Sequence, residues 1–268
     1  MKILVVSDIH ANGEALSSVL DAAYGGYDGL LCLGDIVGYG PDPVPCIRAL
    51  RALEPKLAWC GIIAGNHEGA LSGRVPEEWF SARARASVAY NRRTLGADEL
   101  AWLSALPETA SFGGASPLAI AVHGSPCDPL SGYLFGGDET FEALSYMADT
   151  DVNLCFCGHT HQAVIYSCGW GERLTRPVSG QVASVRAGPV IVNPGSVGFP
   201  RSFNVPVRAD ARSPGELYGV ADEPPPLESF PAYYALWDTE AGTVVFREAR
   251  YDRRNLEERI ARLGLSAQ

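Results

Sequence analysis

Every histidine of the chain directly follows a short apolar run, in the company of aspartate and asparagine side chains. The residues at these positions that could bind a metal or transfer a proton are Asp8, His10, Asp35, Asn66, His67, His123, His159 and His161. A single histidine of this kind would usually be an ordinary core or surface residue. Five histidines together with two carboxylates match instead the donors that hold zinc, manganese, iron, nickel or cobalt. Eight candidates exceed the needs of one ion, so the sequence predicts two ions.

The spacing of these residues indicates how they could share metal ions. Two ions about 3.5 to 4 Å apart need a bridging group, and a carboxylate has two oxygens for that role. Asp8 and Asp35 are the candidates for the bridge. Asp8 and His10 are two positions apart, as are His159 and His161, so each pair lies on one face of an extended segment. We therefore expect both members of a pair to reach the same site.

The elements that would position these side chains are short strands, each ending where a polar cluster begins. The expected strands cover residues 2–7, 29–33, 61–64, 118–122, 152–157 and 190–192. Their Val, Ile, Leu and Cys content suits strands that are buried on both faces. Helical patterns lie between them at residues 12–23, 42–53, 76–95, 98–106 and 139–147, which predicts an α/β protein. Functional groups in such proteins gather at the carboxyl ends of the strands, where these polar clusters stand.

The C-terminal part of the chain has a different composition. Residues 202–231 are rich in Pro, Asp, Glu and Arg, and we expect an irregular insertion that is either a solvated surface loop or a functional lid. Residues 233–249 predict a β-hairpin, and residues 255–263 predict a final helix. The segment 193–198 could be a backbone nest for phosphate or a tight turn, and we favour the turn. Substrate choice should depend on the insertion and on the loop at residues 125–135.

Composition and charge limit the partners of this protein. Lys and Arg number 21 against 31 Asp and Glu, and the net charge of −10 argues against duplex nucleic acid and anionic membranes. A small phosphate-bearing substrate is still compatible, because a local cation could offset the global charge. The seven cysteines form no Cys-x-x-Cys pair, which indicates buried free thiols in a reducing compartment. No apolar run approaches the roughly 18 residues of a membrane span, so we expect a cytoplasmic protein.

Five ordered blocks of residues resemble the calcineurin-like metallophosphoesterase family. The blocks are Asp8-Ile9-His10, Gly34-Asp35, Gly65-Asn66-His67-Glu68, His123-Gly124 and Gly158-His159-Thr160-His161. All five occur in the order typical of the family, and the resemblance covers residues 1 to about 201. The segment 193–198, followed by Pro200 and Arg201, looks like the block that closes the small bacterial phosphodiesterase-like members.

This resemblance implies a fold and a set of metal ligands. The fold would be a four-layer αββα sandwich with a dinuclear metal site at the carboxyl ends of the strands. It would form a single domain over residues 1–268, interrupted by the insertion at about 202–232. Each chain would hold two divalent ions, with manganese expected first and iron, zinc, nickel or cobalt as alternatives. One ion would be held by Asp8, His10, Asp35 and His161, and the other by Asp35, Asn66, His123 and His159.

The resemblance also implies a reaction. A hydroxide activated between the two metals would hydrolyse phosphoesters, as a phosphodiesterase or phosphatase acting on small substrates such as nucleotides or cyclic nucleotides. His67 would protonate the leaving group, and Asn66 would help to hold the phosphoryl oxygens. Arg201 could add a contact to phosphate or could be an exposed surface residue.

One departure from the family pattern keeps two alternatives open. Relatives of the protein phosphatases carry Asp-Arg-Gly shortly after Gly-Asp, whereas here Asp35 is followed by Ile36-Val37-Gly38-Tyr39-Gly40. His67 therefore has no identified carboxylate partner, and a protein Ser/Thr phosphatase becomes a weaker alternative. The other alternative is a non-catalytic scaffold with the same fold. Such relatives usually have eroded ligand positions, and none of the seven is eroded here.

Overall fold

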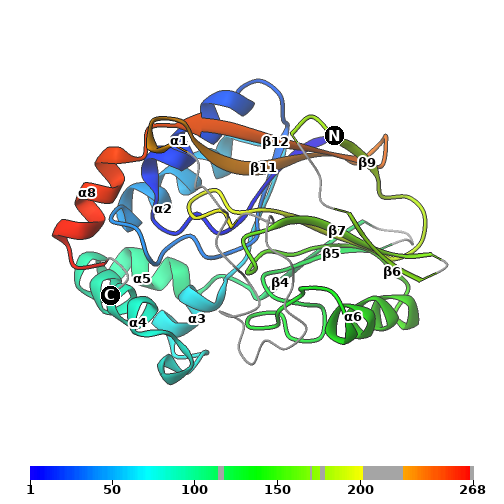
Figure 1. The fold of residues 1–268 in the computed structure, drawn as a ribbon, viewed down its shortest axis with the longest axis horizontal. Helices are drawn as coiled ribbons and strands as arrows, with labels where there is room; N and C mark the ends of the chain where they lie inside the picture. The colour runs from blue at the N-terminus through cyan, green and yellow to red at the C-terminus, as the bar shows by residue number, and fades with distance from the viewer. Residues whose placement is uncertain (114–117, 170, 176–178, 202–225, 266–268) are drawn as a thin grey trace.

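Two six-stranded sheets face each other in the computed structural model, which describes residues 1–113, 118–169, 171–175, 179–201 and 226–265 (Figure 1). The first sheet runs in the order β3 (Trp59–Ile62), β2 (Gly29–Cys32), β1 (Lys2–Val6), β11 (Phe230–Asp238), β12 (Thr243–Tyr251) and β9 (Val182–Ser184). The second runs in the order β4 (Thr109–Phe112), β5 (Leu118–Val122), β6 (Val152–Phe156), β10 (Val190–Pro194), β7 (Ala163–Gly169) and β8 (Gly171–Thr175).

Alternating side chains of the central strands explain the layers. In β1, Ile3 and Val5 point into the core between the sheets, whereas Leu4 and Val6 point to the helices outside the first sheet. The helices covering that outer face are α1 (Gly13–Ala23), α2 (Pro43–Leu53) and α8 (Arg254–Arg262). Helix α6 (Asp138–Asp149) covers the outer face of the second sheet, where Met147 packs in the same cluster as Ile191. The predicted αββα architecture is thus confirmed.

Parallel pairing brings the ends of the predicted strands to one edge of the molecule. Strands β1, β2 and β3 are mutually parallel, and so are β5, β6 and β10. The C-terminal hairpin β11–β12 joins the first sheet by antiparallel pairing with β1. All six strands expected from the apolar runs are present, together with the expected hairpin.

The structure corrects the sequence-based elements in three places. The helix expected over 76–95 is divided into a short 3-10 helix, Glu77–Trp79, and α4 (Ala82–Thr94). The break occurs because the Ser81 side chain accepts a hydrogen bond from the backbone N–H of Ala84 and caps α4. Strands β4, β7, β8 and β9 and helix α3 (Asn66–Ser72) were not expected, and α5 (Ala97–Ser104) begins one residue early.

The predicted insertion falls largely outside the described residues. Residues 202–225 are not described, but β11 already begins at Phe230, so the last residues of the expected 202–232 segment belong to the sheet. Among the cysteines with described side chains, Cys127 is exposed and Cys60 is half-buried, so only part of the expected buried set is confirmed.

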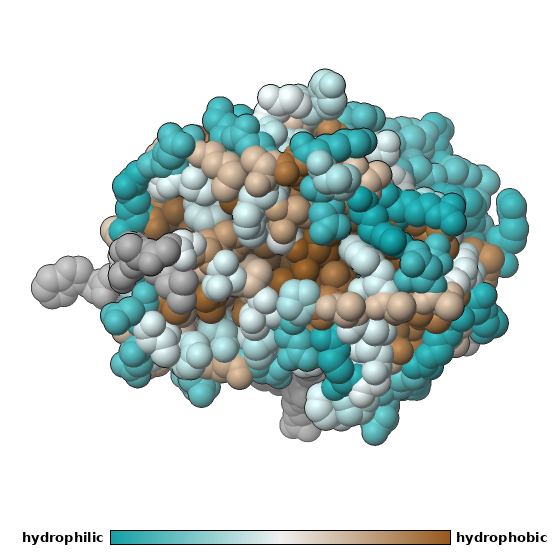
Figure 2. Space-filling view, turned by 180° about the vertical axis from the view of Figure 1, so that it is seen from behind, coloured by the Kyte–Doolittle hydropathy of each residue, from teal (hydrophilic) through white to brown (hydrophobic). Residues whose placement is uncertain are grey.

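On the face seen from behind, hydrophilic side chains surround a central area in which apolar side chains show between them (Figure 2). Exposed large apolar residues are scattered, as Tyr24 and Phe141 illustrate. Among the described residues we find no helix with the length and hydrophobicity that crossing a bilayer requires.

Asn12 joins three parts of the fold. Its side chain accepts a hydrogen bond from the backbone N–H of Ala15, which caps α1, and it donates to the carbonyl of Gly198 and to the Tyr251 hydroxyl. We expect Asn12→Ala to lower the free energy of unfolding by about 3 kcal/mol, because it removes a cap and leaves buried groups unpaired. Urea denaturation measures this change. The exposed Asn255 makes one side-chain hydrogen bond to Glu14, so Asn255→Ala should cost under about 1 kcal/mol; equal losses in both variants would contradict the prediction.

Candidate metal centre

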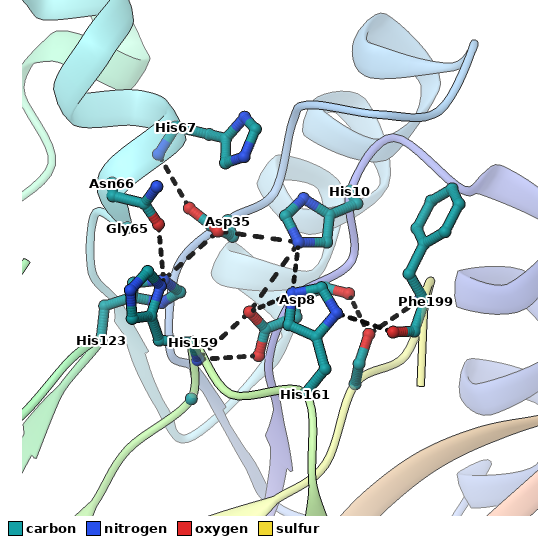
Figure 3. A network of polar contacts seen from close by, with 12 residues as sticks. Asp8, His10, Asp35, Gly65, Asn66, His67, His123, His159, His161 and Phe199 are labelled. Carbon is teal, nitrogen blue, oxygen red and sulfur yellow. Dashed lines mark hydrogen bonds and ion pairs between the residues drawn. The ribbon is translucent and has the colours of Figure 1, made fainter. Parts of the chain in front are cut away.

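Loops at the carboxyl ends of five strands bring the predicted ligands together (Figure 3). The residues that converge there are Asp8 and His10 after β1, Asp35 after β2, Asn66 after β3, His123 after β5, and His159 and His161 after β6. All of them are buried except Asn66, which is half-buried. A buried group of this kind must satisfy its charges and lone pairs internally.

Five of these residues adopt a left-handed backbone conformation that side chains usually avoid. The φ angles are 53° at Asp8, 49° at His10, 50° at Asp35, 64° at His159 and 62° at His161. Hydrogen bonds between the strand-end loops hold them there, including His10 N–H to the Asp35 carbonyl at 2.8 Å. This backbone turns the chain sharply after each strand and directs the side chains to a common centre.

Asp8, His10 and His161 form one group of donors within reach of a single ion. His10 Nδ1 bonds to the carbonyl of Val37 at 3.1 Å and His161 Nδ1 to that of Phe199 at 2.6 Å. A carbonyl only accepts, so each ring carries its proton on Nδ1 and a lone pair on Nε2. The two Nε2 atoms lie 2.9 Å apart, so two acceptors face each other. A cation bound to both nitrogens relieves this repulsion.

His123, Asp35, His159 and Asn66 form the second group. His123 Nδ1 bonds to the Leu33 carbonyl at 2.8 Å, which directs Nε2 toward the other members of the group. That Nε2 lies 3.3 Å from Asp35 Oδ2, 3.1 Å from Asn66 Oδ1 and 3.2 Å from His159 Nδ1. Acceptors thus surround this nitrogen, and the group also fits a divalent cation.

Asp35 lies between the two groups. Its Oδ2 is 3.6 Å from His10 Nε2 and 3.3 Å from His123 Nε2, so one oxygen contacts both sides. Its Oδ1 accepts the backbone N–H of His67 at 2.9 Å. Asp8 lies on the side of His161, at 3.4 Å from that Nε2, and accepts the backbone N–H of His159. Of the two carboxylates considered for a bridge, Asp35 therefore has the bridging geometry.

The electrostatics of the centre favour added positive charge. Burial lowers the pKa of His10 and His159 well below the ordinary value, so both rings are neutral, which is the form that binds metals. Burial also lowers the pKa of His123, but Asp35 and Asp8 outweigh it and raise this pKa to about 9. Burial raises the pKa of Asp8 to about 7. Without an ion, His123 Nε2 therefore takes up a proton beside Asp35, and a divalent cation would replace that proton with its own positive charge.

His67 lies beside the centre, at the start of α3. Its ring packs edge-on against those of His10, Tyr39 and Phe80, with centroids 4.8 to 5.1 Å away. Its Nδ1 is buried and has no hydrogen-bond partner among the described residues. Gly38 lies against this nitrogen, so closely that a Cβ there would come within 2.2 Å of Nδ1. Among the residues that the structure describes, no carboxylate forms a hydrogen bond with His67 Nδ1, and the carboxylate of Asp35 lies nearby in the donor group of His10 and His67.

Glu68 has an organising role that the sequence analysis did not assign. Its buried carboxylate accepts backbone N–H groups from Asp35 at 2.8 Å and Gly65 at 2.8 Å on Oε2, and from Val37 at 3.1 Å on Oε1. It thereby joins the loop that carries Asp35 to the first turn of α3, which carries Asn66 and His67. A glutamate three residues after a helix cap was the available signal.

A pocket of about 370 Å³ opens beside the metal centre, between Asn66 and His159. Arg201 lines this pocket, and its backbone N–H donates to the His161 carbonyl at 3.2 Å. Tyr39 and Tyr133 line it too, and the Tyr133 ring lies 4.0 Å from that of His159. Neither tyrosine was singled out as a site residue, although Tyr133 belongs to the 125–135 loop.

In the segment 193–198, Asn193 and Pro194 end β10 and residues 195–198 form the turn that we favoured over a phosphate nest. The backbone N–H groups of Val197 and Gly198 donate to the carbonyls of Ser7 and Asp8 at 3.0 Å each. The Ser196 hydroxyl donates to the Asp8 carbonyl at 2.8 Å. These bonds support the loop that carries Asp8 and leave no amide of that pair for a ligand.

Comparisons with known proteins agree with this arrangement. A family model described as the calcineurin-like phosphoesterase superfamily domain matches residues 1–209. An uncharacterized protein of Methanocaldococcus jannaschii is 31% identical over 201 residues, which cover 74% of this chain and 77% of that protein. The crystal structure of a metallophosphoesterase from Sphaerobacter thermophilus has a TM-score of 0.75 at 31% identity, over 99% of this chain and 95% of that one. A hypothetical protein of Pyrococcus horikoshii gives 0.72 at 19% identity, over 99% and 94% of the two chains.

Replacing Glu68 should disturb the arrangement of the metal centre without changing any of the candidate metal ligands. In Glu68→Gln one oxygen can still accept from Asp35 and Gly65, but the amide NH₂ would face the N–H of Val37. We expect a loss of about 2 kcal/mol in unfolding free energy and weaker binding of divalent ions. Denaturant titration and metal analysis measure both.

Glu99 provides the matched control for Glu68. It occupies the same position in α5 and accepts one backbone N–H, from Gly96 at 3.0 Å. Glu99→Gln should cost under about 1 kcal/mol and leave metal content unchanged. The proposed role of Glu68 fails if both variants bind metal as the unaltered protein does.

Asp35→Asn should reduce metal content more than any other single ligand change, because Asp35 alone contacts both donor groups. We expect loss of most bound metal and a fall in melting temperature of several degrees, as bound ligands stabilise the folded state. Elemental analysis of the purified variant and calorimetry with and without a chelator provide the measurements. Asp42→Asn, which changes a carboxylate outside the centre, should keep the metal; unchanged metal in Asp35→Asn would contradict the bridging geometry.

Proposed function

Because the chain belongs to the calcineurin-like phosphoesterase superfamily, we propose that it hydrolyses small phosphoesters with two divalent metal ions. The observation that carries this proposal is Asp35 Oδ2, which lies between two buried groups of metal donors beside an open pocket. The alternative of a non-catalytic scaffold is less consistent with seven intact donors whose lone pairs face one another.

The metal ligands in this proposal follow the two donor groups. One ion is held by Asp8, His10, Asp35 and His161, and the other by Asp35, Asn66, His123 and His159. Nitrogen and oxygen donors without thiolate suit manganese, with iron, zinc, nickel or cobalt as alternatives. Such ions supply Lewis acidity that polarises a phosphoryl group and lowers the pKa of water. Their charges also outweigh those of the two aspartates, which makes the site attractive to phosphate within an acidic protein.

The other residues of the pocket bind and orient the substrate. Asn66 lies at the N-terminus of α3 with its amide toward the donors, and Arg201 faces the same pocket with a guanidinium suited to phosphate oxygens. Tyr39 and Tyr133 offer aromatic faces on which the planar base of a nucleotide or cyclic nucleotide can stack. A pocket of about 370 Å³ suits a substrate of that size.

His67 provides the proton for the leaving oxygen in this proposal. Its backbone is fixed by the bond to Asp35 and its ring by the packing of Tyr39 and Phe80. Burial lowers the pKa of His67, and a substrate phosphate nearby would favour the protonated form again. The nearby charge of Asp35 acts against burial and favours the protonated form of His67, although Nδ1 itself has no hydrogen-bond partner among the described residues.

A pair of aryl phosphates tests the reaction class. Turnover of bis-p-nitrophenyl phosphate and p-nitrophenyl phosphate, each with added manganese, separates phosphodiesterase from phosphatase activity. Metal analysis of the purified protein accompanies the assay. Hydrolysis of neither compound with any of the five candidate metals would overturn the proposal and favour the scaffold alternative.

His67→Ala should keep the metal and lose turnover selectively. We expect at least about a hundredfold loss on phenyl phosphate, whose leaving group needs a proton. The loss should be about tenfold or less on p-nitrophenyl phosphate, whose leaving group is stable as an anion. Comparing kcat for the two esters in the same variant gives an internal control. Equal losses on both esters would exclude His67 as the proton donor.

A further inference from the structure

A second pocket, of about 520 Å³, lies on the other side of Tyr39 and Arg201 from the pocket described above. Both residues line the two pockets, as Ser81 also does, so one molecule can extend from the first into the second. His161 lines the second pocket and connects it to the metal centre.

The charged side chains of this second pocket are three arginines and one glutamate. Arg83 comes from α4, Arg253 precedes α8, and Arg201 follows the segment that carries Phe199. Arg253 Nε donates to Glu257 at 2.5 Å, which neutralises one of the positive charges. Arg83 donates only to the carbonyl of Leu265, at 3.1 Å, and neither it nor Arg201 forms an ion pair among the residues that the structure describes. The pocket thus carries excess positive charge in a protein of net charge −10.

Aromatic rings hold two of these arginines close together. The Arg83 guanidinium lies 5.4 Å from the ring centre of Phe199 and 5.1 Å from that of Tyr39. The Arg253 guanidinium lies 4.9 Å from the same Phe199 ring and 4.2 Å from that of Phe230. Cation–π contacts offset part of the repulsion between like charges and keep the guanidinium groups ordered. Burial lowers the pKa of Arg83, while among its neighbours Tyr39 and Glu257 raise this pKa and Arg253 and Arg201 lower it.

The same phenylalanine belongs to the metal centre. The carbonyl of Phe199 accepts the hydrogen bond from His161 Nδ1 at 2.6 Å that fixes this ring (Figure 3). The backbone N–H of Arg201 donates to the His161 carbonyl. An anion in the second pocket is therefore at a fixed position relative to the donors around Asp8.

We propose that Arg83, Arg201 and Arg253 form a subsite for a second phosphate group of the substrate, while the first phosphoryl group lies at the metal centre. Guanidinium groups bind phosphate through paired hydrogen bonds, and several together suit a group with two negative charges. The substrates are then small molecules that carry at least two phosphate groups. This inference rests on the proposed function, because it assumes that a phosphoryl group occupies the metal centre.

Bisphosphonates test the subsite directly, since their carbon–phosphorus bonds resist hydrolysis. Alkane-α,ω-bisphosphonates with one to four methylene groups are titrated calorimetrically into the manganese-loaded protein, with methylphosphonate as the single-group reference. The unaltered protein should bind the best member of the series at least about tenfold more tightly than methylphosphonate.

Two arginine variants should remove this gain. Arg83→Gln and Arg253→Gln should each lower the affinity for the best bisphosphonate about tenfold. The affinity for methylphosphonate should change less than about twofold. Arg254→Gln is the matched control, because Arg254 adjoins Arg253 but pairs with Asp252 on the exposed side. It should change neither ligand. Arg201 lines both pockets, so Arg201→Gln should weaken the binding of both ligands, and that of the bisphosphonate more strongly. Its guanidinium forms no hydrogen bond to a described residue, so this variant should fold.

The possible outcomes distinguish a phosphate group of the substrate from free phosphate. They also distinguish failure of the subsite from failure of the proposed hydrolysis. Equal weakening of methylphosphonate and bisphosphonate would overturn the subsite and indicate a site for free phosphate. Unchanged bisphosphonate affinity in Arg83→Gln, Arg253→Gln and Arg201→Gln would overturn it as well. Selective loss of bisphosphonate affinity in a protein that hydrolyses no aryl phosphate would support the subsite and contradict the proposed function alone.

Discussion

The contact on which the structure depends is the approach of two imidazole nitrogens, His10 Nε2 and His161 Nε2, with both lone pairs facing inward. Each ring is fixed from behind by a backbone carbonyl, so neither can turn a proton toward the other. The arrangement is stable only with positive charge at its centre. The strand ends, the left-handed backbone of the loops and the buried carboxylate of Glu68 all serve to maintain it.

Much of this centre could be predicted from the sequence because its donors are local features of strand ends. An apolar run predicts a strand, and the polar residue at its end, such as Asp8 or His123, is the candidate ligand. Both signals therefore lie in adjacent residues. The role of Glu68 could not be predicted, because its bonds to Asp35 and Val37 depend on two loops meeting in space. The division of the expected helix at Ser81 could not be predicted either. The helical pattern of apolar residues continues through Ser81, and only the structure shows that its side chain caps α4.

The arginines of the second pocket could not be recognised from the sequence either, because residues far apart in the chain form this pocket. Arg83 and Arg253 lie far apart in the sequence, and the fold brings both guanidinium groups to the Phe199 ring. Nothing in either local sequence distinguishes them from other surface arginines, such as Arg254. Gly38, by contrast, could be seen in the sequence, but the reason for a glycine there could not. The structure supplies that reason, because a Cβ at this position would collide with the His67 ring.

The pairing of β1 with β11 has a consequence for biosynthesis. Strand β1 lies between β2 and β11, a strand that is translated more than two hundred residues after it. The hydrogen bond from Asn12, which lies beside the metal donors, to the Tyr251 hydroxyl likewise joins residues far apart in the sequence. Contacts of such sequence separation form slowly, because a long loop must close before they are gained. Until β11 and β12 are synthesised, β1 therefore has an open edge, and the loop after β1 lacks the support of the Tyr251 hydroxyl.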